Sequence, residues 1–349
     1  MVNNPIYQED LQHIVSFPSI RWKDLEDSSV LISGATGMIG RCLTDAIMLK
    51  NQKDNLRCKV IALGRSSEKA RKRFASYWGN SYFRFIECDI NETSTLPKVT
   101  EANFVLHLAS NTHPVAYATD PIGTITANII GTKNMLDLAI HGSASRFLFA
   151  SSNEIYGENR GDRELFDEAY CGYIDCNTLR AGYPESKRCG EALCQAYKEQ
   201  KGLDVVVARL TRSFGPTLLP TDTKALSQFL RNGLNHEDIV LKSAGNQHYS
   251  YTYTADAVTG LLTVLTHGEN GEAYNISDQT CDVRLKELAA IIAKIAGTQV
   301  IFDLPSETEK QGFSKATKAR LDGSKLHALG WSASFSIEEG LHRTLSCLK

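Results

Sequence analysis

The sequence lacks long apolar runs and segments of biased composition. Its 349 residues include no stretch of about eighteen apolar residues, the length that a membrane-spanning helix needs. The first residues, Met1–Asp27, are polar and mixed in charge, without the basic start and apolar run of a signal peptide. We therefore expect a folded protein of the cytoplasm that does not associate with membranes.

An excess of charge and a cysteine framework are also missing. With 38 basic and 40 acidic side chains and a net charge of -2, the chain has no global positive field to hold nucleic acid. Its nine cysteines form no Cys-x-x-Cys pair, and an odd number is typical of reduced thiols. Because no histidine stands at a matching interval from them, we predict no metal site.

The order of apolar runs indicates the fold class. From Val30 to Phe214, short runs rich in Val, Ile, Leu and Phe alternate with segments of helical length and periodicity. Such continuous hydrophobicity is typical of strands in a sheet that is covered on both faces. We expect an α/β, Rossmann-type doubly wound parallel sheet. Its predicted strands are 30–33, 59–63, 82–87, 104–108, 146–151 and 205–210.

The length of the chain favours a second, smaller domain, because one hydrophobic core rarely organises so many residues. Beyond Gly215-Pro216 the alternation loosens into short strands and helices. We expect these helices near 225–235, 255–266, 285–296 and 337–347. The predicted parts are an N-terminal extension 1–28 with a short helix 5–15, a large domain 29–216, and a smaller α/β domain 217–349.

A glycine-rich turn follows the first predicted strand directly. It reads Gly34-Ala35-Thr36-Gly37-Met38-Ile39-Gly40 and precedes an amphipathic helix. Three glycines spaced by three suit a tight turn in which backbone N–H groups and a helix N-terminus face a pyrophosphate. In this position the pattern predicts a dinucleotide site, and a plain strand-to-helix turn is the alternative. The residues predicted to bind the cofactor are Gly34, Thr36, Gly37, Met38, Ile39 and Gly40.

The end of the second predicted strand bears on which dinucleotide binds. An NAD enzyme normally offers an acid to the ribose there, but this strand ends Leu63-Gly64-Arg65-Ser66. Arg65 can pair with a 2′-phosphate and stack on adenine, and Ser66 adds a hydroxyl. The pair favours NADP over NAD, whereas a solvated turn arginine would leave NAD possible, so both cofactors stay open.

A tyrosine and a lysine one helical turn apart are candidates for catalysis. A tyrosine has a pKa near 10, and an ammonium on the same helix face stabilises its phenolate. Tyr183 and Lys187 have this spacing, but Tyr197 and Lys201 repeat it, so the spacing alone is not specific. Ser152, at the end of an earlier strand, can hydrogen-bond the substrate oxygen. Its alternative role is a hydroxyl bonded to backbone.

Together these residues resemble the extended short-chain dehydrogenase/reductases, also called the NAD-dependent epimerase/dehydratase family, over nearly the whole chain from Val30. Further stretches similar to family motifs are Cys88-Asp89-Ile90, His107-Leu108-Ala109-Ser110, the asparagine-containing helical stretch from Asn128 to Asn134, and Leu329-Gly330-Trp331. The resemblance implies that the domain 29–216 binds NAD(P) and carries the catalytic residues. It adds as cofactor-binding residues Asp89, Ile90, Leu108, Ala109, Ser110, Asn128 and Lys187.

The resemblance also implies a nucleotide-sugar substrate, bound mainly by residues 217–349. Glu154 stands where 4,6-dehydratases have the residue that removes the C5 proton after C4 oxidation, and Asn153 stands beside it in the expected catalytic site. Asn153 cannot donate a proton as an acid, which argues against a dehydratase that needs one there. The stretch from Arg180 to Tyr183 looks most like the UDP-glucuronate decarboxylase branch.

Two positions depart from that branch. Arg212 replaces a usual asparagine, and Tyr249 stands where an arginine usually grips the nucleotide diphosphate. Arg212 with Arg320 can supply bidentate partners for a diphosphate, and surface ion pairs are the alternative for both. The resemblance further implies a homodimer through the helices 124–141 and 183–201.

Three functions fit the residues. The main expectation is a redox cycle in which C4 of a nucleotide sugar is oxidised and the keto sugar is epimerised, dehydrated or decarboxylated, for surface-polysaccharide precursors. The second is net NAD(P)H-dependent reduction of a nucleotide-linked ketose or keto-sugar, such as a CDP-linked one giving an alditol. The third is a non-catalytic dinucleotide sensor, although such proteins typically lose the tyrosine or lysine that this chain keeps.

Overall fold

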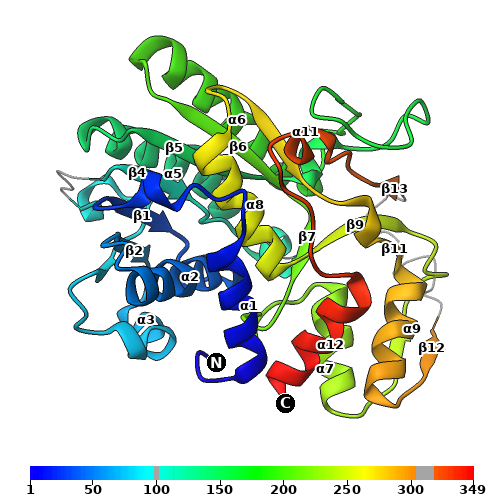
Figure 1. Cartoon of the computed structure of the whole chain (residues 1–349). Coiled ribbons are helices and arrows are strands. Elements are labelled where there is room, and N and C mark those ends of the chain that lie inside the picture. The colour runs from blue at the N-terminus through cyan, green and yellow to red at the C-terminus, as the bar shows by residue number, and fades with distance from the viewer. Residues whose placement is uncertain (98–101, 113, 304–317) are drawn as a thin grey trace.

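The computed structural model of the chain describes residues 1–97, 102–112, 114–303 and 318–349 (Figure 1). A seven-stranded, fully parallel sheet forms its centre, in the order β3-β2-β1-β4-β5-β6-β10. The fold class expected from the sequence is therefore confirmed. Its strands are β1 (Ser29–Ser33), β2 (Lys59–Gly64), β3 (Phe83–Glu87), β4 (Phe104–His107), β5 (Arg146–Ser152), β6 (Val205–Leu210) and β10 (Ala273–Ile276).

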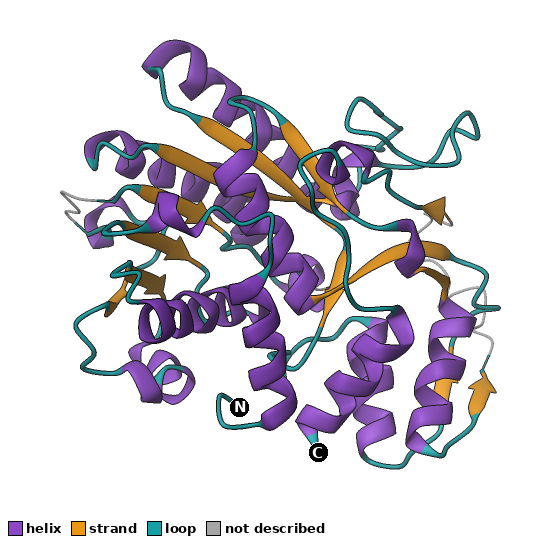
Figure 2. Cartoon of the chain, viewed as in Figure 1, coloured by secondary structure: helices purple, strands orange, loops and turns teal. Residues whose placement is uncertain are grey.

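Helices cover both faces of this sheet (Figure 2). Alternate side chains of one strand enter two cores, because Val30 and Ile32 of β1 pack in one and Leu31 in the other. Burial on both sides explains why these strands are apolar along their whole length. The covering helices are α2 (Met38–Asp54) and α8 (Thr254–His267) on one face, and α5 (Pro121–His141) and α6 (Gly182–Lys201) on the other.

A smaller layer follows β6. Its four-stranded sheet centres on β9, which pairs with β7, β11 and β13, and β8 pairs with β12 beside it. Its strands are β7 (Arg212–Phe214), β8 (Ile239–Leu241), β9 (His248–Tyr253), β11 (Asp282–Arg284), β12 (Val300–Phe302) and β13 (Lys318–Ala319). Its helices are α7 (Ala225–Leu234), α9 (Leu285–Ala296) and α12 (Ile337–Leu348).

The two layers are interleaved along the chain. Residues 217–349, expected as a mainly substrate-binding part, also supply α8 and β10 to the large sheet. Tyr274 and Ile276 of β10 are buried against this sheet. The strand therefore forms backbone hydrogen bonds with β6 and buries its apolar side chains in the same place. The remaining short elements are α3 (Ser67–Arg73), α4 (Pro114–Thr119), α11 (Ser324–His327), η1 (Trp22–Leu25), η2 (Ala75–Tyr77), η3 (Thr93–Thr95), η4 (Asn153–Tyr156), η5 (Leu179–Ala181) and η6 (Gln279–Cys281).

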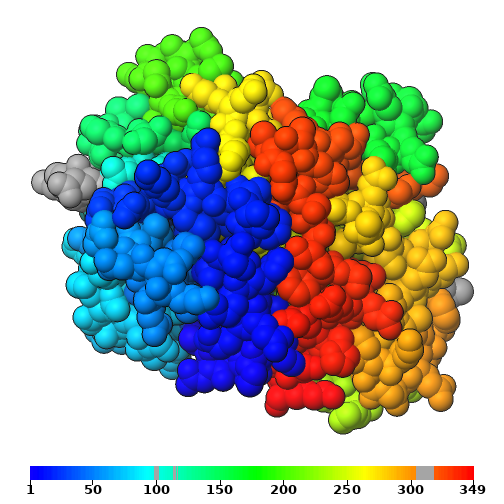
Figure 3. Space-filling view, in the orientation of Figure 1, coloured from blue at the N-terminus to red at the C-terminus, as the bar shows by residue number. Residues whose placement is uncertain are grey.

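The N-terminal extension joins the two layers. Its helix α1 (Pro5–Ser16) contacts α2, α8 and α12, and Figure 3 shows the first and last segments of the chain side by side. The Tyr7 hydroxyl donates to Asp45 on α2 at 2.8 Å. On the other side, Arg343 of α12 donates to the buried Asp10 at 2.7 Å. The extension therefore holds the large sheet and the C-terminal helix in one arrangement.

No helix among the described residues has the length and apolar character needed to cross a membrane. The same residues hold no group of three or more histidine, cysteine, aspartate or glutamate side chains arranged to bind a metal ion.

Candidate functional site

A cavity of about 980 Å³ opens at the carboxyl edge of the large sheet. It lies where β1 and β4 neighbour each other and the strand order reverses, the place where open α/β sheets bind ligands. Most of the residues selected from the sequence line it. The selected residues that do not line it are Ser66, Asn128 and Arg320.

The glycine turn forms one wall of this cavity. Gly34 has a φ of +70°, and a Cβ added there would lie 2.7 Å from the Ala109 backbone nitrogen. A Cβ on Gly40 would lie 2.5 Å from the Gly34 carbonyl oxygen. These close approaches need glycine, and they let α2 begin at Met38 with its first N–H groups toward the cavity. Thr36, Met38 and Ile39 complete this wall.

A buried histidine holds the strand ends beneath the turn. His107 Nδ1 lies 2.6 Å from Ser33 Oγ, and its Nε2 lies 3.1 Å from Thr132 Oγ1. The Thr132 hydroxyl donates to the Asn128 carbonyl, so Nε2 carries the proton and Nδ1 accepts from Ser33. Burial, with a smaller effect of the Lys187 charge, lowers the pKa of His107 to about 3. The ring is therefore neutral, and it fixes β1 to β4.

At the end of β2, the exposed Arg65 lines the cavity, while Ser66 caps α3 by accepting the Lys69 N–H at 3.2 Å. Lys69 lines the same end of the cavity and was not selected from the sequence. A lysine four residues after Arg65 at the start of a helix is a pattern that could have pointed to it. Two cations, Arg65 and Lys69, therefore line the cavity where the chain leaves β2.

Asp89 and Ile90 follow β3 and line the cavity beside Asn91, which was not selected either. Asp89 accepts the Asn91 N–H at 2.9 Å. The Asn91 Oδ1 atom is buried without a hydrogen-bond partner in the part of the chain that the structure describes. A buried unpaired acceptor favours a ligand that carries an N–H group, such as adenine. The residues around it therefore fit a bound dinucleotide.

Asn128 lies behind the cavity wall, where it links the cofactor side to the helix α6. Its Oδ1 accepts the Ser110 hydroxyl at 2.8 Å, and its Nδ2 donates to Ser186 Oγ at 3.0 Å. Ser186 in turn donates to the Tyr183 carbonyl at 2.9 Å. Leu108, expected with Ser110 beside the cofactor, lines the cavity. The asparagine therefore orients the first turn of α6 relative to β4.

Tyr183, Lys187 and Ser152 all line the cavity, and Ser152 hydrogen-bonds Tyr183. Tyr183 is buried, and burial and the Glu154 charge raise its pKa, while a hydrogen bond with Ser152 lowers it. The Lys187 ammonium donates to the Ala150 carbonyl at 2.8 Å, and burial lowers the pKa of Lys187 to about 7. Tyr183 is thus a neutral phenol here, placed with a hydroxyl and an amine as a proton-transfer site requires.

The repeated pair further along α6 has a different environment. The Tyr197 hydroxyl donates to Asp137 of α5 at 2.6 Å, and neither Tyr197 nor Lys201 lines the cavity. Burial and the Asp137 carboxylate raise the pKa of Tyr197. The same four-residue spacing therefore occurs twice on one helix, but only the first pair faces the cavity.

Two residues missed from the sequence reasoning complete the wall next to Tyr183. Arg180 of η5 places its Nη2 atom 2.6 Å from Glu154 Oε2, and Tyr117 of α4 stacks on Tyr183 with ring centroids 4.8 Å apart. Asn153 of η4 is buried beside Glu154. Arg180 stood in the motif before Tyr183, but nothing in the sequence around Tyr117 pointed to this site.

Of the three residues predicted from the sequence to bind substrate, two line the cavity and one does not. Arg212 of β7 and Tyr249 of the paired strand β9 line the cavity, and the guanidinium carbon lies 3.6 Å from the tyrosine ring centroid. Arg212 Nη1 is buried with no hydrogen-bond partner among the described residues. Arg320 instead donates to Asp282 at 2.7 Å and to Glu164 at 2.8 Å, outside the cavity. Arg320 therefore occupies the ion pairs that were its alternative role.

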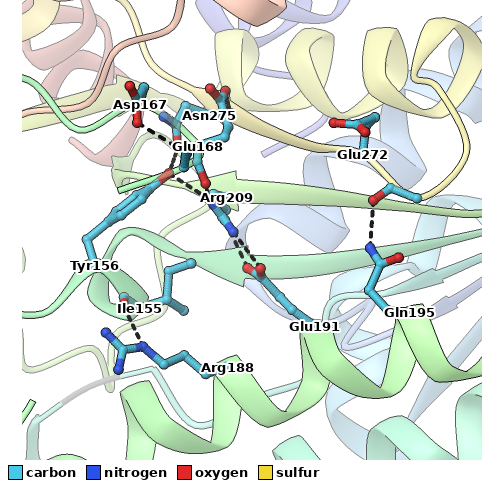
Figure 4. A network of polar contacts seen from close by, with 12 residues as sticks. Ile155, Tyr156, Asp167, Glu168, Arg188, Glu191, Gln195, Arg209, Glu272 and Asn275 are labelled. Atoms are coloured by element: carbon cyan, nitrogen blue, oxygen red, sulfur yellow. Dashed lines mark hydrogen bonds and ion pairs between the residues drawn. The ribbon is translucent and has the colours of Figure 1, made fainter. Parts of the chain in front are cut away.

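Figure 4 shows an ion pair between α6 and β6, and neither of its two residues lines the cavity. Arg209 of β6 binds both oxygens of Glu191 at 3.0 and 2.7 Å. It also donates to the Tyr156 hydroxyl at 3.0 Å and the Glu168 carbonyl at 2.6 Å. Glu191 is one turn beyond Lys187, and its charge raises the pKa of that lysine against the larger effect of burial. The pair therefore fixes α6 to the sheet.

Comparisons with known proteins identify similar sequences and structures. The model of the NAD dependent epimerase/dehydratase family matches residues 30–277. UDP-glucuronic acid decarboxylase 1 of Xenopus tropicalis is 30% identical over 331 residues, which are 94% of this chain and 74% of that protein.

Two solved structures have the same fold. A dTDP-glucose 4,6-dehydratase from Streptomyces venezuelae, solved with NAD, gives a TM-score of 0.78 at 24% identity, covering 91% of this chain and 96% of that one. A UDP-glucuronic acid 4-epimerase from Bacillus cereus, in complex with UDP-glucuronic acid and NAD, gives 0.76 at 22% identity, covering 92% and 98%.

Proposed function

Because the chain belongs to the NAD dependent epimerase/dehydratase family, we propose that it oxidises the C4 hydroxyl of a nucleotide-linked sugar at the Tyr183 centre. The observation that carries this proposal is the meeting of Tyr183, Ser152 and Lys187 in one cavity with the glycine turn. The relatives described above are named for reactions of nucleotide sugars, which supports this substrate class.

The roles of these residues follow from their contacts. A nicotinamide dinucleotide, when bound, supplies the acceptor for the hydride that leaves the sugar carbon. Ser152 donates a hydrogen bond to the sugar hydroxyl. Tyr183, after losing its own proton to become a phenolate, accepts the proton of that hydroxyl as its C–O bond becomes a carbonyl. A positive charge on Lys187, one turn further along α6, favours the phenolate. The buried position of all three keeps water from competing for the proton.

The dinucleotide would be held by the glycine turn and the first turn of α2 at its pyrophosphate, and by Asp89, Ile90 and Asn91 at its adenine. We propose NADP as the preferred form. Arg65 and Lys69 support this choice, because two cations at one end of the cavity match the charge of a 2′-phosphate. The family and the solved relatives are named with NAD, so the proposed preference for NADP rests on Arg65 and Lys69 alone.

Within the family, the decarboxylase branch has the most support. The relative from Xenopus tropicalis, which matches nearly the whole chain, is named a UDP-glucuronic acid decarboxylase. In such a reaction C4 oxidation would be followed by loss of the C5 carboxylate as carbon dioxide, by uptake of a proton at C5, and by return of the hydride to C4. Arg212 lines the cavity, and its buried Nη1 atom has no hydrogen-bond partner in the described part of the chain, so its guanidinium can bind an anionic group of the substrate, the diphosphate or the sugar carboxylate. The product would serve as a precursor of a surface polysaccharide.

We also propose a homodimer through α5 and α6. These helices pack against each other, yet Ile122 and Ile130 of α5 remain 75% and 44% exposed, and the neighbouring Leu179 is 64% exposed. Exposed apolar side chains on α5 and directly before α6 favour burial by a second copy. Light scattering on the purified protein would report a dimer mass, and a monomer at micromolar concentration would contradict the proposal.

One assay separates the possible reactions. The purified protein is incubated with NAD or NADP, and in parallel with NADH or NADPH, together with a panel of UDP-, dTDP-, GDP- and CDP-linked sugars that includes UDP-glucuronic acid. The masses of the products are measured by mass spectrometry. Loss of carbon dioxide identifies a decarboxylase, loss of water a dehydratase and unchanged mass an epimerase. A gain of two hydrogens would identify a net reductase, and no turnover of any sugar would contradict the proposed function.

The Tyr183→Phe variant tests the site itself. Removing the hydroxyl leaves no group to accept the proton, so we expect turnover to fall by at least about a thousandfold, within the range for an acid–base residue. Cofactor binding should stay near wild type. Tyr197→Phe is the matched control, because it changes the same residue type on the same helix outside the cavity. Full activity of Tyr183→Phe would overturn the assignment.

A further inference from the structure

Arg180 connects two side chains of the cavity wall next to Tyr183. Its Nη2 atom lies 2.6 Å from Glu154 Oε2, and its guanidinium carbon lies 5.1 Å from the centroid of the Tyr117 ring. Tyr117 stacks on Tyr183 with an interplanar angle of 27°. All four residues line the cavity. One arginine therefore contacts both the Glu154 carboxylate and the Tyr117 ring that is packed against Tyr183.

Charges of opposite sign act on Tyr183 from these neighbours. After burial, the Glu154 carboxylate is the largest influence that raises the pKa of Tyr183, and Arg180 lowers it. Ser152 of β5 and Tyr117 of α4 hydrogen-bond Tyr183. Lys187 lies one turn along α6, next to the pair Glu191 and Arg209. The remaining groups near Tyr183 are Tyr249 of β9 with Arg212 of β7, and Asp222, whose charge acts on Tyr117.

We propose that Arg180 is a positioning residue that neutralises Glu154 and, through the Tyr117 ring, holds Tyr183 in place for proton transfer. The proposal rests on the proposed function, because it assigns Arg180 a task in the oxidation of the sugar hydroxyl. It assigns Arg180 no contact with the reacting atoms.

The geometry suits an arginine in particular. A planar guanidinium can pair with a carboxylate through its N–H groups while its face stacks on an aromatic ring. A lysine ammonium at this place would keep the charge opposite Glu154 but lose the flat contact with Tyr117. Without a cation, the Glu154 carboxylate would face Tyr183 alone and would oppose the formation of a second negative charge on the phenol.

The test follows the pH dependence of sugar oxidation, which does not require later steps. Enzyme in excess, loaded with cofactor, is mixed with UDP-glucuronic acid as the probe, and the absorbance of the reduced nicotinamide is followed in a stopped-flow instrument. For Arg180→Met we expect the midpoint of the rise in rate with pH to move up by about one unit, the size typical of a nearby charge. Adding Glu154→Gln to this variant should move the midpoint back toward wild type.

This return in the double variant separates positioning from support of the fold, because removing a second contact does not repair a damaged structure. Arg180→Lys keeps the charge and should leave the midpoint near wild type while lowering the maximal rate. The matched control is Arg160→Met. Arg160 also pairs with an acid, Asp162 at 2.8 Å, and lies over a tyrosine ring, Tyr170 at 5.3 Å, but it does not line the cavity. Its midpoint should not move.

The possible outcomes distinguish failure of the role of Arg180 from failure of the proposed function. An unchanged midpoint in Arg180→Met, or a raised midpoint that Glu154→Gln does not lower, overturns the role of Arg180 while the proposed function stands. If Arg180→Met does not fold, the comparison of Arg180→Lys with wild type takes its place, and a shifted midpoint there overturns the role. If the wild-type protein oxidises no nucleotide sugar, the proposed function fails, and this inference fails with it.

Discussion

Replacing Arg209 by methionine is predicted to destabilise the protein strongly. The side chains of Arg209 and Glu191 are 11% and 15% exposed, and two short hydrogen bonds join them. Removing one partner of a buried ion pair costs about 3–5 kcal/mol, because the other charge is left without compensation. Since a little water reaches both groups, we expect a loss near the lower end, about 3 kcal/mol.

The loss should have a particular origin, which a second substitution tests. Most of it comes from the stranded Glu191 carboxylate, so Arg209→Met with Glu191→Gln should be more stable than Arg209→Met alone by about 1–2 kcal/mol. The contacts of Arg209 with the Tyr156 hydroxyl and the Glu168 carbonyl stay lost in both variants. Urea unfolding followed by far-ultraviolet circular dichroism measures the free energy of unfolding of each protein.

The control for this prediction is Arg163→Met. Arg163 and Asp167 form an ion pair at 3.7 Å with side chains 61% and 43% exposed, and such surface pairs contribute less than about 1 kcal/mol. A loss in Arg209→Met as small as that of the control would refute the reasoning. So would a double variant less stable than Arg209→Met, because relief of the stranded charge would then be absent.

Further predictions concern the cofactor half of the cavity. In Gly34→Ala the new Cβ would lie 2.7 Å from the Ala109 backbone nitrogen, and the alanine would have to adopt a positive φ. The midpoint of thermal unfolding should therefore fall by several degrees, and an unchanged midpoint would contradict the close packing. Because burial keeps the folded pKa of His107 at about 3, below its unfolded value near 6.5, its contribution to stability is present above pH 6.5 and is lost as the pH falls toward 3. Urea midpoints of wild type and His107→Gln should therefore converge on acidification, and parallel curves would argue against a neutral ring. Alanine at Arg65 or Lys69 should weaken NADPH binding roughly tenfold, about 1.4 kcal/mol, with NADH little affected, and an equal loss for both cofactors in calorimetric titration would refute a 2′-phosphate contact.

Local sequence patterns were sufficient for most of the large sheet. The six strands expected from apolar runs match β1 to β6 within one or two residues at each end, because strands buried on both faces must be apolar throughout. The strand β10 was missed. Its run from Ala273 to Ile276 is only four residues long and lies far along the chain, inside the part expected to bind substrate. Its place depends on the free edge of β6, which no local pattern describes.

The sequence by itself determined the glycine turn and the pair Tyr183 and Lys187, because a tight turn and one helical turn are fixed by neighbours in the chain. The roles of the site residues stay predictions, but their assembly in one cavity is a structural observation. Only the tertiary structure decided that Tyr197 faces away, that Arg212 lines the cavity whereas Arg320 does not, and that Arg180 pairs with Glu154. These contacts join loops from separate strands at one edge of the sheet, and their distances depend on how the whole chain packs.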